Sequence, residues 1–341
     1  HRADDDQSKR KRACTVTTSA FSTLTPDCVM NAMDSLGYRC DGRLLALNSY
    51  ENRVYQVGME DDLPLIAKFY RPQRWTDAAI LEEHAFVQEL AEHEIPVVAA
   101  LAVGGSTLHC FDGFRFAVFP RHGGRAPEFE DRDTLEWMGR FLGRIHAVGA
   151  LKSFEHRPRL DIASFGEEPL HFLLTHEFIP ADLEAAYRSV AEQALAGIRH
   201  CFEQAGNHPG LRLHGDCHAG NVLWTDHGPH FVDFDDSRMA PAVQDLWMLL
   251  SGDRADMTRQ LLDVLEGYEN FYDFDGRQLH LIEALRTLRL IHYSAWLAQR
   301  WDEPAFRHAF PWFNTQRYWQ ERILELREQI ALMMEPPLQL L

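Results

Sequence analysis

The pattern of the chain changes near residue 120, and this change restricts the possible folds more than any other feature. The residues before it contain short β-type stretches. Those after it contain long stretches with apolar residues three or four positions apart, such as Leu135, Met138 and Leu142. Strands gathered in one part of a chain and helices in the other are typical of α+β proteins built from two unlike halves.

The first part of the chain predicts a small antiparallel sheet with two helices. Strands are expected at 43–50, 53–58, 63–70, 106–111 and 114–119. The first three follow one another through short turns and should form a meander, while Asp112-Gly113 is a strong hairpin signal between the last two. Helices are expected at 25–37 and 76–94.

The second part predicts a mostly helical body. Helices are expected from residue 131, and at about 181–205, 240–251, 255–271, 276–300 and 314–334, with a short β insert at 211–213, 222–224 and 230–232. The proline- and glycine-containing segment 120–124 interrupts both patterns and marks the boundary. We therefore expect a disordered tail at 1–20, a β-rich lobe at 21–120 and a helical lobe at 121–341.

Composition excludes some classes of partner. The chain has 34 Lys and Arg residues and 51 Asp and Glu residues, which gives a net charge of −17. Such a charge argues against sequence-independent binding to nucleic acid or to an anionic membrane surface. The six cysteines are irregularly spaced, and no apolar run is long enough to cross a bilayer. We expect a cytoplasmic monomer with reduced thiols and no nucleic-acid or membrane partner.

One polar segment carries the candidate chemistry. Residues 213–224 read LHGDCHAGNVLW, and FVDFD follows at 231–235. A short hairpin between them can bring the side chains of Asp216, Asn221 and Asp233 together. Phosphoryl transfer from ATP needs a carboxylate that orients the attacking hydroxyl, and oxygen ligands that hold Mg²⁺ against the phosphates. Asp216 fits the first role, and Asn221 and Asp233 fit the metal-binding role, so Asp216 and Asp233 are the candidate catalytic residues.

The spacing H-G-D-x-H-x-x-N followed by x-D-F-D resembles the catalytic loop of the aminoglycoside phosphotransferase and choline kinase superfamily. With LNSYENRVYQV at 47–57 and KFYRPQRW at 68–75, the chain is similar to one branch in particular, the stress response kinase A (RdoA-type) family of bacterial Ser/Thr protein kinases. The resemblance covers nearly the whole chain. It implies a bilobal protein-kinase-like fold, ATP and Mg²⁺, and protein Ser/Thr hydroxyls as acceptors, including those of the enzyme itself.

The resemblance also implies roles for residues outside the catalytic loop. Lys68 matches the third-strand lysine that contacts the α- and β-phosphates, and Glu83, favoured over Glu82 by the family spacing, matches its partner on the next helix. Ser49 lies in a glycine-poor turn and is expected to contact the phosphates. The main chain of two residues at the lobe junction is expected to hold adenine, namely Phe119 and Arg121.

Two features depart from the eukaryotic kinase pattern, and a third feature, Asp245, matches a residue that supports the catalytic loop. The second carboxylate motif reads DFD at 233–235 instead of DFG, and no A-P-E segment follows it. Regulation by a Phe flip or by a long activation loop is therefore not expected. Asp245 matches a superfamily aspartate that supports the catalytic loop from a helix.

Other functions of the same segment are less well supported. His214 and His218 invite a zinc site, but Gly215 and Gly220 predict a loop, and we expect both histidines to hydrogen-bond to backbone. Cys217 could be a redox sensor. However, a neighbouring carboxylate raises the pKa of a thiol, and an inert structural cysteine is expected.

Three functions fit the motifs to different degrees. The first is an ATP- and Mg²⁺-dependent Ser/Thr protein kinase. The second is a kinase for a small alcohol of the aminoglycoside, choline or homoserine type, which would use the same catalytic residues. The third, an inactive ATP-binding scaffold, is disfavoured because all the acidic and amide ligands are present. If the acidic surplus of the chain lines the substrate cleft, it favours a cationic substrate.

Overall fold

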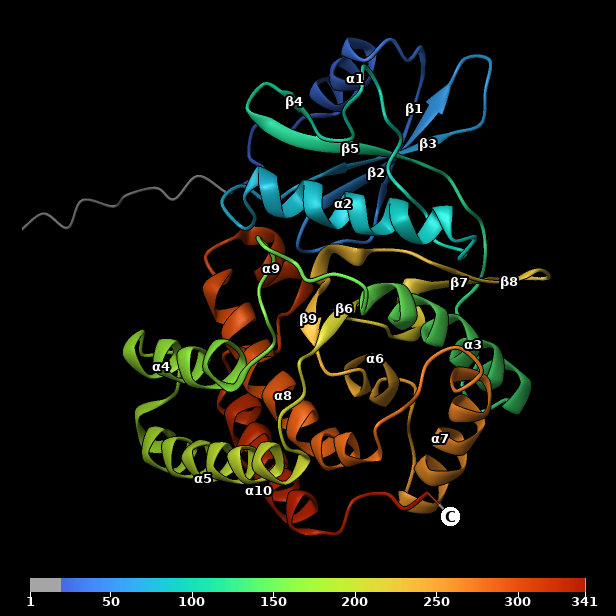
Figure 1. The fold of residues 1–341 in the computed structure, drawn as a ribbon. Coiled ribbons are helices and arrows are strands. Elements are labelled where there is room, and N and C mark those ends of the chain that lie inside the picture. Colours follow the sequence, from blue (N-terminus) through green and yellow to red (C-terminus); the bar gives the residue numbers. More distant parts are fainter. Residues whose placement is uncertain (1–19, 341) are drawn as a thin grey trace, which may run out of the picture.

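The computed structural model describes residues 20–340, so the predicted tail at 1–20 lies, apart from its last residue, outside the described residues. Figure 1 shows a β-rich part stacked on a larger helical part, which is the bilobal arrangement expected from the sequence. Within the described residues, no helix is both long and apolar enough to cross a membrane.

The N-terminal lobe is a five-stranded antiparallel sheet with two helices. Its elements are α1 (Pro26–Ser35), β1 (Cys40–Leu47), β2 (Arg53–Met59), β3 (Leu65–Phe69), α2 (Asp77–Glu92), β4 (His109–Phe111) and β5 (Phe114–Pro120). The strand order is β1-β2-β3-β5-β4, so the predicted meander and hairpin are both confirmed. The Thr25 hydroxyl accepts a hydrogen bond from the N–H of Cys28 and caps α1.

The two faces of this sheet have different neighbours. Ala67 and Phe69 of β3 lie in a buried cluster with α1 residues such as Val29. Because successive side chains of a strand point to opposite faces, Lys68 faces the other way. That face lies toward α2 and the C-terminal lobe (Figure 1). The alternation of β3 therefore directs one lysine toward the junction between the lobes.

The C-terminal lobe carries two small sheets and most of one large apolar core, which also includes Phe86, Val87 and Leu90 of α2. Its helices are α3 (Arg132–Gly149), α4 (Glu168–Thr175), α5 (Ala181–Ala205), α6 (Val243–Trp247), α7 (Arg254–Tyr268), α8 (Ile282–Gln299), α9 (Pro304–Ala309) and α10 (Gln316–Met334). Its strands are β6 (Leu211–Leu213), β7 (Val222–Thr225), β8 (Gly228–Phe231) and β9 (Arg238–Ala240), in the pairs β6–β9 and β7–β8. Short helical turns occur at Ala163–Glu167, Ala219–Asn221, Phe234–Asp236 and Gly276–Leu281.

The differences from the predicted elements fall on short segments. Helices α4 and α9 and strand β9 were not predicted, and α6 covers only the middle of the expected 240–251. Two helical turns or three strand residues are too few to display a periodicity. Ala240 ends β9 and Pro241 follows it, so the helix begins later than its apolar pattern indicated.

Helices α3 and α7 touch through their backbones. A Cβ atom on Gly139 would lie 1.9 Å from the backbone oxygen of Val264. A Cβ atom on Gly267 would lie 2.0 Å from the backbone oxygen of Glu136, and Gly143 makes a third contact of this kind. The glycines therefore allow a helix spacing that no larger residue permits.

We predict that Gly139→Ala lowers the free energy of unfolding by about 3 kcal/mol, because the added methyl group meets backbone that cannot move without separating the helices. Urea unfolding followed by circular dichroism measures the change. Gly197→Ala in α5 is the matched control, since its Cβ would meet only the flexible end of Met333 at 3.1 Å. Equal losses in the two variants would contradict the proposed backbone contact.

Candidate active site

The loop that follows β6 is anchored by one buried carboxylate. Asp245 of α6 accepts hydrogen bonds from the backbone N–H groups of His214 at 3.0 Å and Gly215 at 2.9 Å. Gly215 has φ +90°, and a Cβ there would lie 2.2 Å from the backbone oxygen of Asp236. Glycine therefore lets the loop cross the segment after β8 at close range.

A buried chain of side chains orients Asp245. Nε2 of His146 on α3 donates to Oδ2 of Asp245 at 3.0 Å, since a carboxylate oxygen can only accept. Nδ1 of His146 shares a hydrogen bond of 2.7 Å with the hydroxyl of Tyr268 on α7. Three helices thus fix the start of the loop, in agreement with the supporting role expected of Asp245.

Hydrogen bonds place the loop after β6 beside the loop after β8. His214 Nε2 donates to the backbone oxygen of Val232 at 2.8 Å, and the N–H of Val232 donates to the backbone oxygen of Asn221 at 3.0 Å. Asn221 Nδ2 donates to the backbone oxygen of Asp216 at 2.9 Å. Within residues 20–340 no hydrogen bond reaches Oδ1 of Asn221, so this oxygen is available as a ligand.

Two cationic or potentially cationic side chains flank the carboxylate of Asp216. Arg289 of α8 donates from Nη1 to Oδ1 at 2.6 Å, and Nε2 of His218 lies 3.3 Å from Oδ2. Burial raises the pKa of Asp216, but the hydrogen bond from His218 and the charge of Arg289 outweigh it and hold the pKa well below its usual range. Asp216 is therefore ionised and able to accept a hydrogen bond from a hydroxyl group.

Asp233 projects from a sharp bend toward the N-terminal lobe. It follows β8 with φ +58°, in the left-handed region that residues other than glycine rarely adopt. Its Oδ1 accepts a hydrogen bond from Lys68 Nζ at 2.9 Å, and the same Nζ lies 3.5 Å from Oδ1 of Asp235. Burial lowers the pKa of Lys68, but the two carboxylates outweigh it and raise the pKa above its ordinary value. A charged lysine thus joins the lobes.

The expected ion pair between Lys68 and Glu83 is not formed in the part of the chain that the structure describes. Lys68 instead contacts Asp233 and Asp235, while Glu83 is 3% exposed and its Oε2 has no hydrogen-bond partner there. Burial raises the pKa of Glu83 to about 7, although Lys68 and Arg157 act in the opposite direction. The two carboxylates of the DFD segment compete for the lysine, and a proton can neutralise Glu83 in its place.

The neighbouring Glu82 has a different role from that of Glu83. Its carboxylate accepts hydrogen bonds from three successive backbone N–H groups of the C-terminal lobe, those of Glu155, His156 and Arg157. A carboxylate engaged in this way is not free to pair with Lys68. Of the two candidates considered from the sequence, only Glu83 is therefore placed to act on the lysine.

A cluster of buried charges surrounds the DFD segment. Arg74 contacts the carboxylate of Asp235 and donates from Nη2 to Oδ1 of Asp236 at 2.8 Å. Arg157 donates to the backbone oxygen of Asp235. Burial raises the pKa of Asp235, but Arg74 and then Lys68 outweigh it and hold the pKa well below its usual range. Sequence analysis assigned no role to Asp235 or Arg74, although both lie in segments quoted there.

The predicted phosphate-binding turn is held against α8 and α9. Ser49 lies half-buried in the turn between β1 and β2. Two residues later, Glu51 forms an ion pair with Arg300 at 2.8 Å, and the ring of Tyr50 lies with its centroid 4.8 Å from that of Phe310. The turn is therefore positioned by the C-terminal lobe as well as by its own strands.

An exposed apolar surface lies on the same face of the sheet as Lys68. Leu47, Val54 and Lys68 occupy one row of the β1–β2–β3 register, and Leu45 lies in the next row, which continues to Phe119. Leu45 is 57% exposed, and Leu47 is 37% exposed. Apolar side chains that remain exposed above buried charged groups are suited to cover a flat ring.

Arg121 follows β5 and donates from Nε to Oε1 of Gln56 at 3.0 Å, so the structure places both predicted adenine-binding residues at the end of β5. Gln56 shares the row of the sheet that holds Leu45 and Phe119. The lobe junction, the two predicted adenine-binding residues and the exposed apolar surface therefore form one continuous region.

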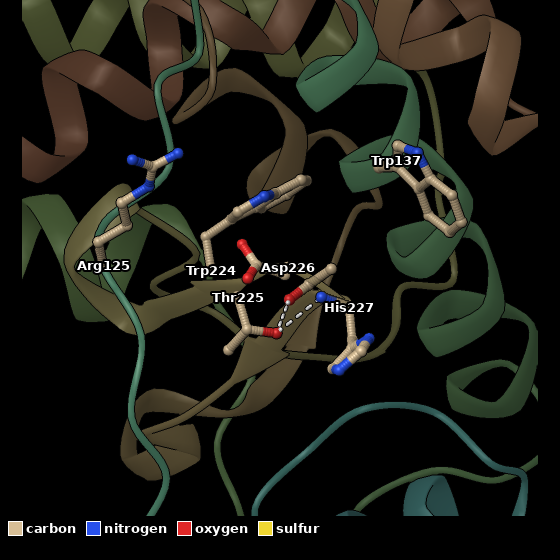
Figure 2. A pocket seen from close by; sticks show the side chains of 7 residues that line it. Arg125, Trp137, Trp224, Thr225, Asp226 and His227 are labelled. Atoms are coloured by element: carbon tan, nitrogen blue, oxygen red, sulfur yellow. Dashed lines mark hydrogen bonds between the residues drawn. The ribbon is translucent and has the colours of Figure 1, made fainter.

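A separate hollow of about 700 Å³ lies between the β7–β8 hairpin and α3, and Figure 2 shows the side chains that line it. These are Arg125, Trp137, Trp224, Thr225, Asp226, His227 and Gly228. The hydroxyl of Thr225 accepts from the N–H of His227 and closes the hairpin turn. None of the predicted site residues lines this hollow, so we assign no part of the reaction to it.

The alternatives of a zinc site and a redox cysteine gain no support. Within residues 20–340, no three His, Cys, Asp or Glu side chains are arranged to hold a metal ion. His218 Nδ1 accepts a hydrogen bond from the N–H of Gly220, and His214 binds backbone as described above. Cys217 is fully buried, and burial followed by the charges of Asp245 and Asp216 raises the pKa of its thiol. A buried thiol of this kind is inert.

The comparisons with known proteins identify the family. A sequence model of the phosphotransferase enzyme family matches residues 43–282, and the chain belongs to this family. Stress response kinase A of Escherichia coli K12 is 47% identical over 94% of this chain and 97% of that protein. The serine/threonine protein kinase RdoA of Salmonella typhimurium is 45% identical over the same shares. The resemblance stated from the motifs is confirmed, and the protein is a kinase of the branch that includes these relatives.

Solved structures show the same fold at low sequence identity. Amicoumacin kinase hAmiN, in complex with AMP-PNP, Ca²⁺ and Ami, has a TM-score of 0.70 at 20% identity, with 92% of this chain and 95% of that chain covered. A microcompartment-associated aminopropanol kinase has a TM-score of 0.65 at 17% identity, with 89% and 96% covered. These likenesses confirm the predicted kinase-like architecture.

We predict that the buried carboxyl of Glu83 makes stability depend on pH. Its pKa is about 7 in the folded chain and 4.5 ordinarily, so the folded state holds the proton more tightly and this stabilisation is lost as pH rises through 7. The free energy of unfolding of the wild type, relative to Glu83→Gln, should fall by on the order of 3 kcal/mol between pH 4.5 and 8.

Urea unfolding of both proteins over this pH range measures the difference, since groups common to both proteins cancel. Glu92→Gln, on the exposed side of the same helix, is the control for removing a carboxylate from α2. Parallel pH profiles for the wild type and Glu83→Gln would show that Glu83 is ionised in the folded protein.

Proposed function

We propose that this protein is an ATP- and Mg²⁺-dependent protein kinase that phosphorylates Ser and Thr hydroxyls, including its own. The observation that carries the proposal is the junction between the lobes. There a charged lysine, an ionised carboxylate in a rigid loop and an amide oxygen available as a ligand lie below an exposed apolar surface. We assign residues 21–120 to the ATP-binding lobe and residues 121–341 to the lobe that carries the catalytic loop and binds the substrate.

The proposed reaction uses each of these groups in one step. The acceptor hydroxyl donates a hydrogen bond to Asp216, and its oxygen attacks the γ-phosphorus of ATP. The bond from that phosphorus to the β–γ bridging oxygen breaks, and ADP leaves with the electron pair. The hydroxyl proton passes to Asp216. Lys68 and the turn that contains Ser49 hold the phosphates in line, and Leu45 and Leu47 cover the adenine ring.

The residues present fit a magnesium ion. Mg²⁺ prefers oxygen ligands and keeps several positions for phosphate and water. Asn221 supplies an amide oxygen that accepts no hydrogen bond within the described residues, and Asp233 supplies a carboxylate of which only Oδ1 contacts Lys68. When bound, the ion would neutralise charge on the phosphates.

Support for a protein substrate comes from the relatives at 45–47% identity, of which one is named a serine/threonine protein kinase. The solved structures of similar fold are named as kinases of amicoumacin and of aminopropanol. At 17–20% identity they bear on the fold and not on the acceptor. A small alcohol remains the second candidate substrate, because the same catalytic residues would serve either acceptor.

We predict that Asp216→Asn lowers the rate of phosphate transfer by about 10³-fold, because the amide cannot accept the hydroxyl proton. The protein is incubated with γ-labelled ATP and Mg²⁺, and either a set of Ser/Thr peptides or a panel of small alcohols. Label on the peptides supports a protein kinase, and label only on the alcohols replaces it by the second candidate. Asp226→Asn, an exposed aspartate of the β7–β8 turn, is the matched control.

We predict that Asp233→Asn raises the Mg²⁺ concentration needed for transfer, and that it changes the affinity for ATP measured without Mg²⁺ much less. The variant should need at least about tenfold more Mg²⁺ for half-maximal transfer, because an anionic ligand is lost. Chelation with EDTA should stop transfer by the wild type. An unchanged Mg²⁺ requirement in Asp233→Asn would remove this residue from the metal site.

A further inference from the structure

Arg289 contacts the catalytic loop, but the proposed reaction gives it no role. It lies in the middle of α8, and its Nη1 donates to Oδ1 of Asp216 at 2.6 Å. Its side chain is 46% exposed. Apart from the sulfur of Met248 at 4.0 Å, it has no other hydrogen-bond partner within the described residues. A guanidinium group has five N–H donors, so most of those of Arg289 are available to a ligand.

Three buried arginines near the lobe junction are different. Arg71, Arg74 and Arg157 are largely buried, and each donates to two or more acceptors. Their contacts hold the lobes together and leave little room for an additional anion. Arg289 therefore differs from them in its exposure, in its unused donors and in its position against the catalytic carboxylate.

We propose that Arg289 binds an anionic group of the substrate that lies next to the acceptor hydroxyl, so that this enzyme selects Ser and Thr residues in acidic peptide segments. This inference rests on the proposed function and specifies its substrate. A hydroxyl group bound to Asp216 lies within reach of Arg289, because Arg289 contacts Oδ1 of the same carboxylate. A carboxylate on the neighbouring peptide residue would then meet the unused donors of Arg289, which suit a bidentate contact.

The ion pair between Arg289 and Asp216 can be exchanged for such a contact. The Arg289 side chain is 46% exposed and the Asp216 side chain 21% exposed, and ion pairs that water reaches contribute little to stability. Arg289 can therefore turn toward a substrate carboxylate without disturbing the fold. The exchange exposes Oδ1 of Asp216 to the incoming hydroxyl, while His218 continues to hold Oδ2. An acidic substrate thus completes the site, whereas a basic one meets an arginine of the same sign.

The charge around Asp216 is opposite to that of the whole chain. The net charge is −17, and sequence analysis noted that an acidic cleft would favour a cationic substrate. The groups that touch the Asp216 carboxylate within the described residues are Arg289 and His218. The exposed guanidinium of Arg289 beside the Asp216 carboxylate therefore favours an anionic group next to the acceptor hydroxyl.

The experiment compares three peptides that differ only beside a single central Ser. The residues on both sides are Glu in the first, Ala in the second and Lys in the third, and kcat/KM for phosphate transfer is measured with saturating ATP and Mg²⁺. The wild type should prefer the Glu peptide over the Lys peptide by at least about tenfold. Arg289→Gln should bring this ratio close to one, and Arg289→Lys should retain part of it.

Arg286→Gln is the matched control, since Arg286 lies one turn earlier on α8 and contacts Glu283 and the backbone of Leu250 instead of Asp216. It should keep the wild-type ratio. The proposal is overturned if the wild type shows no preference for the Glu peptide, or if Arg289→Gln keeps the preference. It is also overturned if Arg289→Gln slows all three peptides equally, because Arg289 then only positions Asp216.

Failure of the protein-kinase proposal can be distinguished from failure of the proposed role of Arg289. If no peptide accepts phosphate, the protein-kinase proposal fails. The same variants are then compared on two small alcohols, anionic glycerate and cationic choline. A preference for glycerate that Arg289→Gln removes would support the role of Arg289 in binding an anion. A preference for choline would overturn it.

Discussion

The lobes of this protein meet across buried charge, and a buried charge must be paired. Lys68 reaches from the sheet to Asp233, and Arg74 reaches from the same lobe to Asp235. Glu51 joins the turn between β1 and β2 to Arg300. These contacts hold the lobes in their relative position, because separating the lobes would leave each of these charged groups without its partner.

The pairing also explains why Glu83 differs from its expected role. A lysine between three carboxylates cannot serve all of them equally, and in this structure Asp233 and Asp235 are the ones within 4 Å. Glu83 is left buried without a cation within ion-pair distance among the described residues, and burial raises its pKa so that protonation can replace the missing cation. Binding of nucleotide phosphates and a metal ion near Asp233 would change this competition, because both add charge beside the lysine.

The fold and part of the site could be predicted because their signals are local. The hairpin dipeptide Asp112-Gly113 and the cap at Thr25 act on adjacent residues, and the loop holding Asp216 and Asn221 is one short segment. The partners of the buried charges have no such signal. Arg74 and Asp235 are 161 positions apart, and Arg289 and Asp216 are 73 apart, so only the three-dimensional arrangement relates them. Short elements such as β9 escaped prediction for a different reason, because three strand residues are too few to display a periodicity.

The glycine contact between α3 and α7 has a consequence for the loop that carries Asp216. Gly143 lies against the backbone of Tyr268, and the hydroxyl of this tyrosine orients His146, which in turn orients Asp245. The spacing between α3 and α7 therefore affects the position of the loop that carries Asp216, through the side chains of Tyr268, His146 and Asp245. In the proposed reaction, residues that never meet a substrate would therefore set the position of Asp216, and a substitution that separates α3 from α7 would displace it.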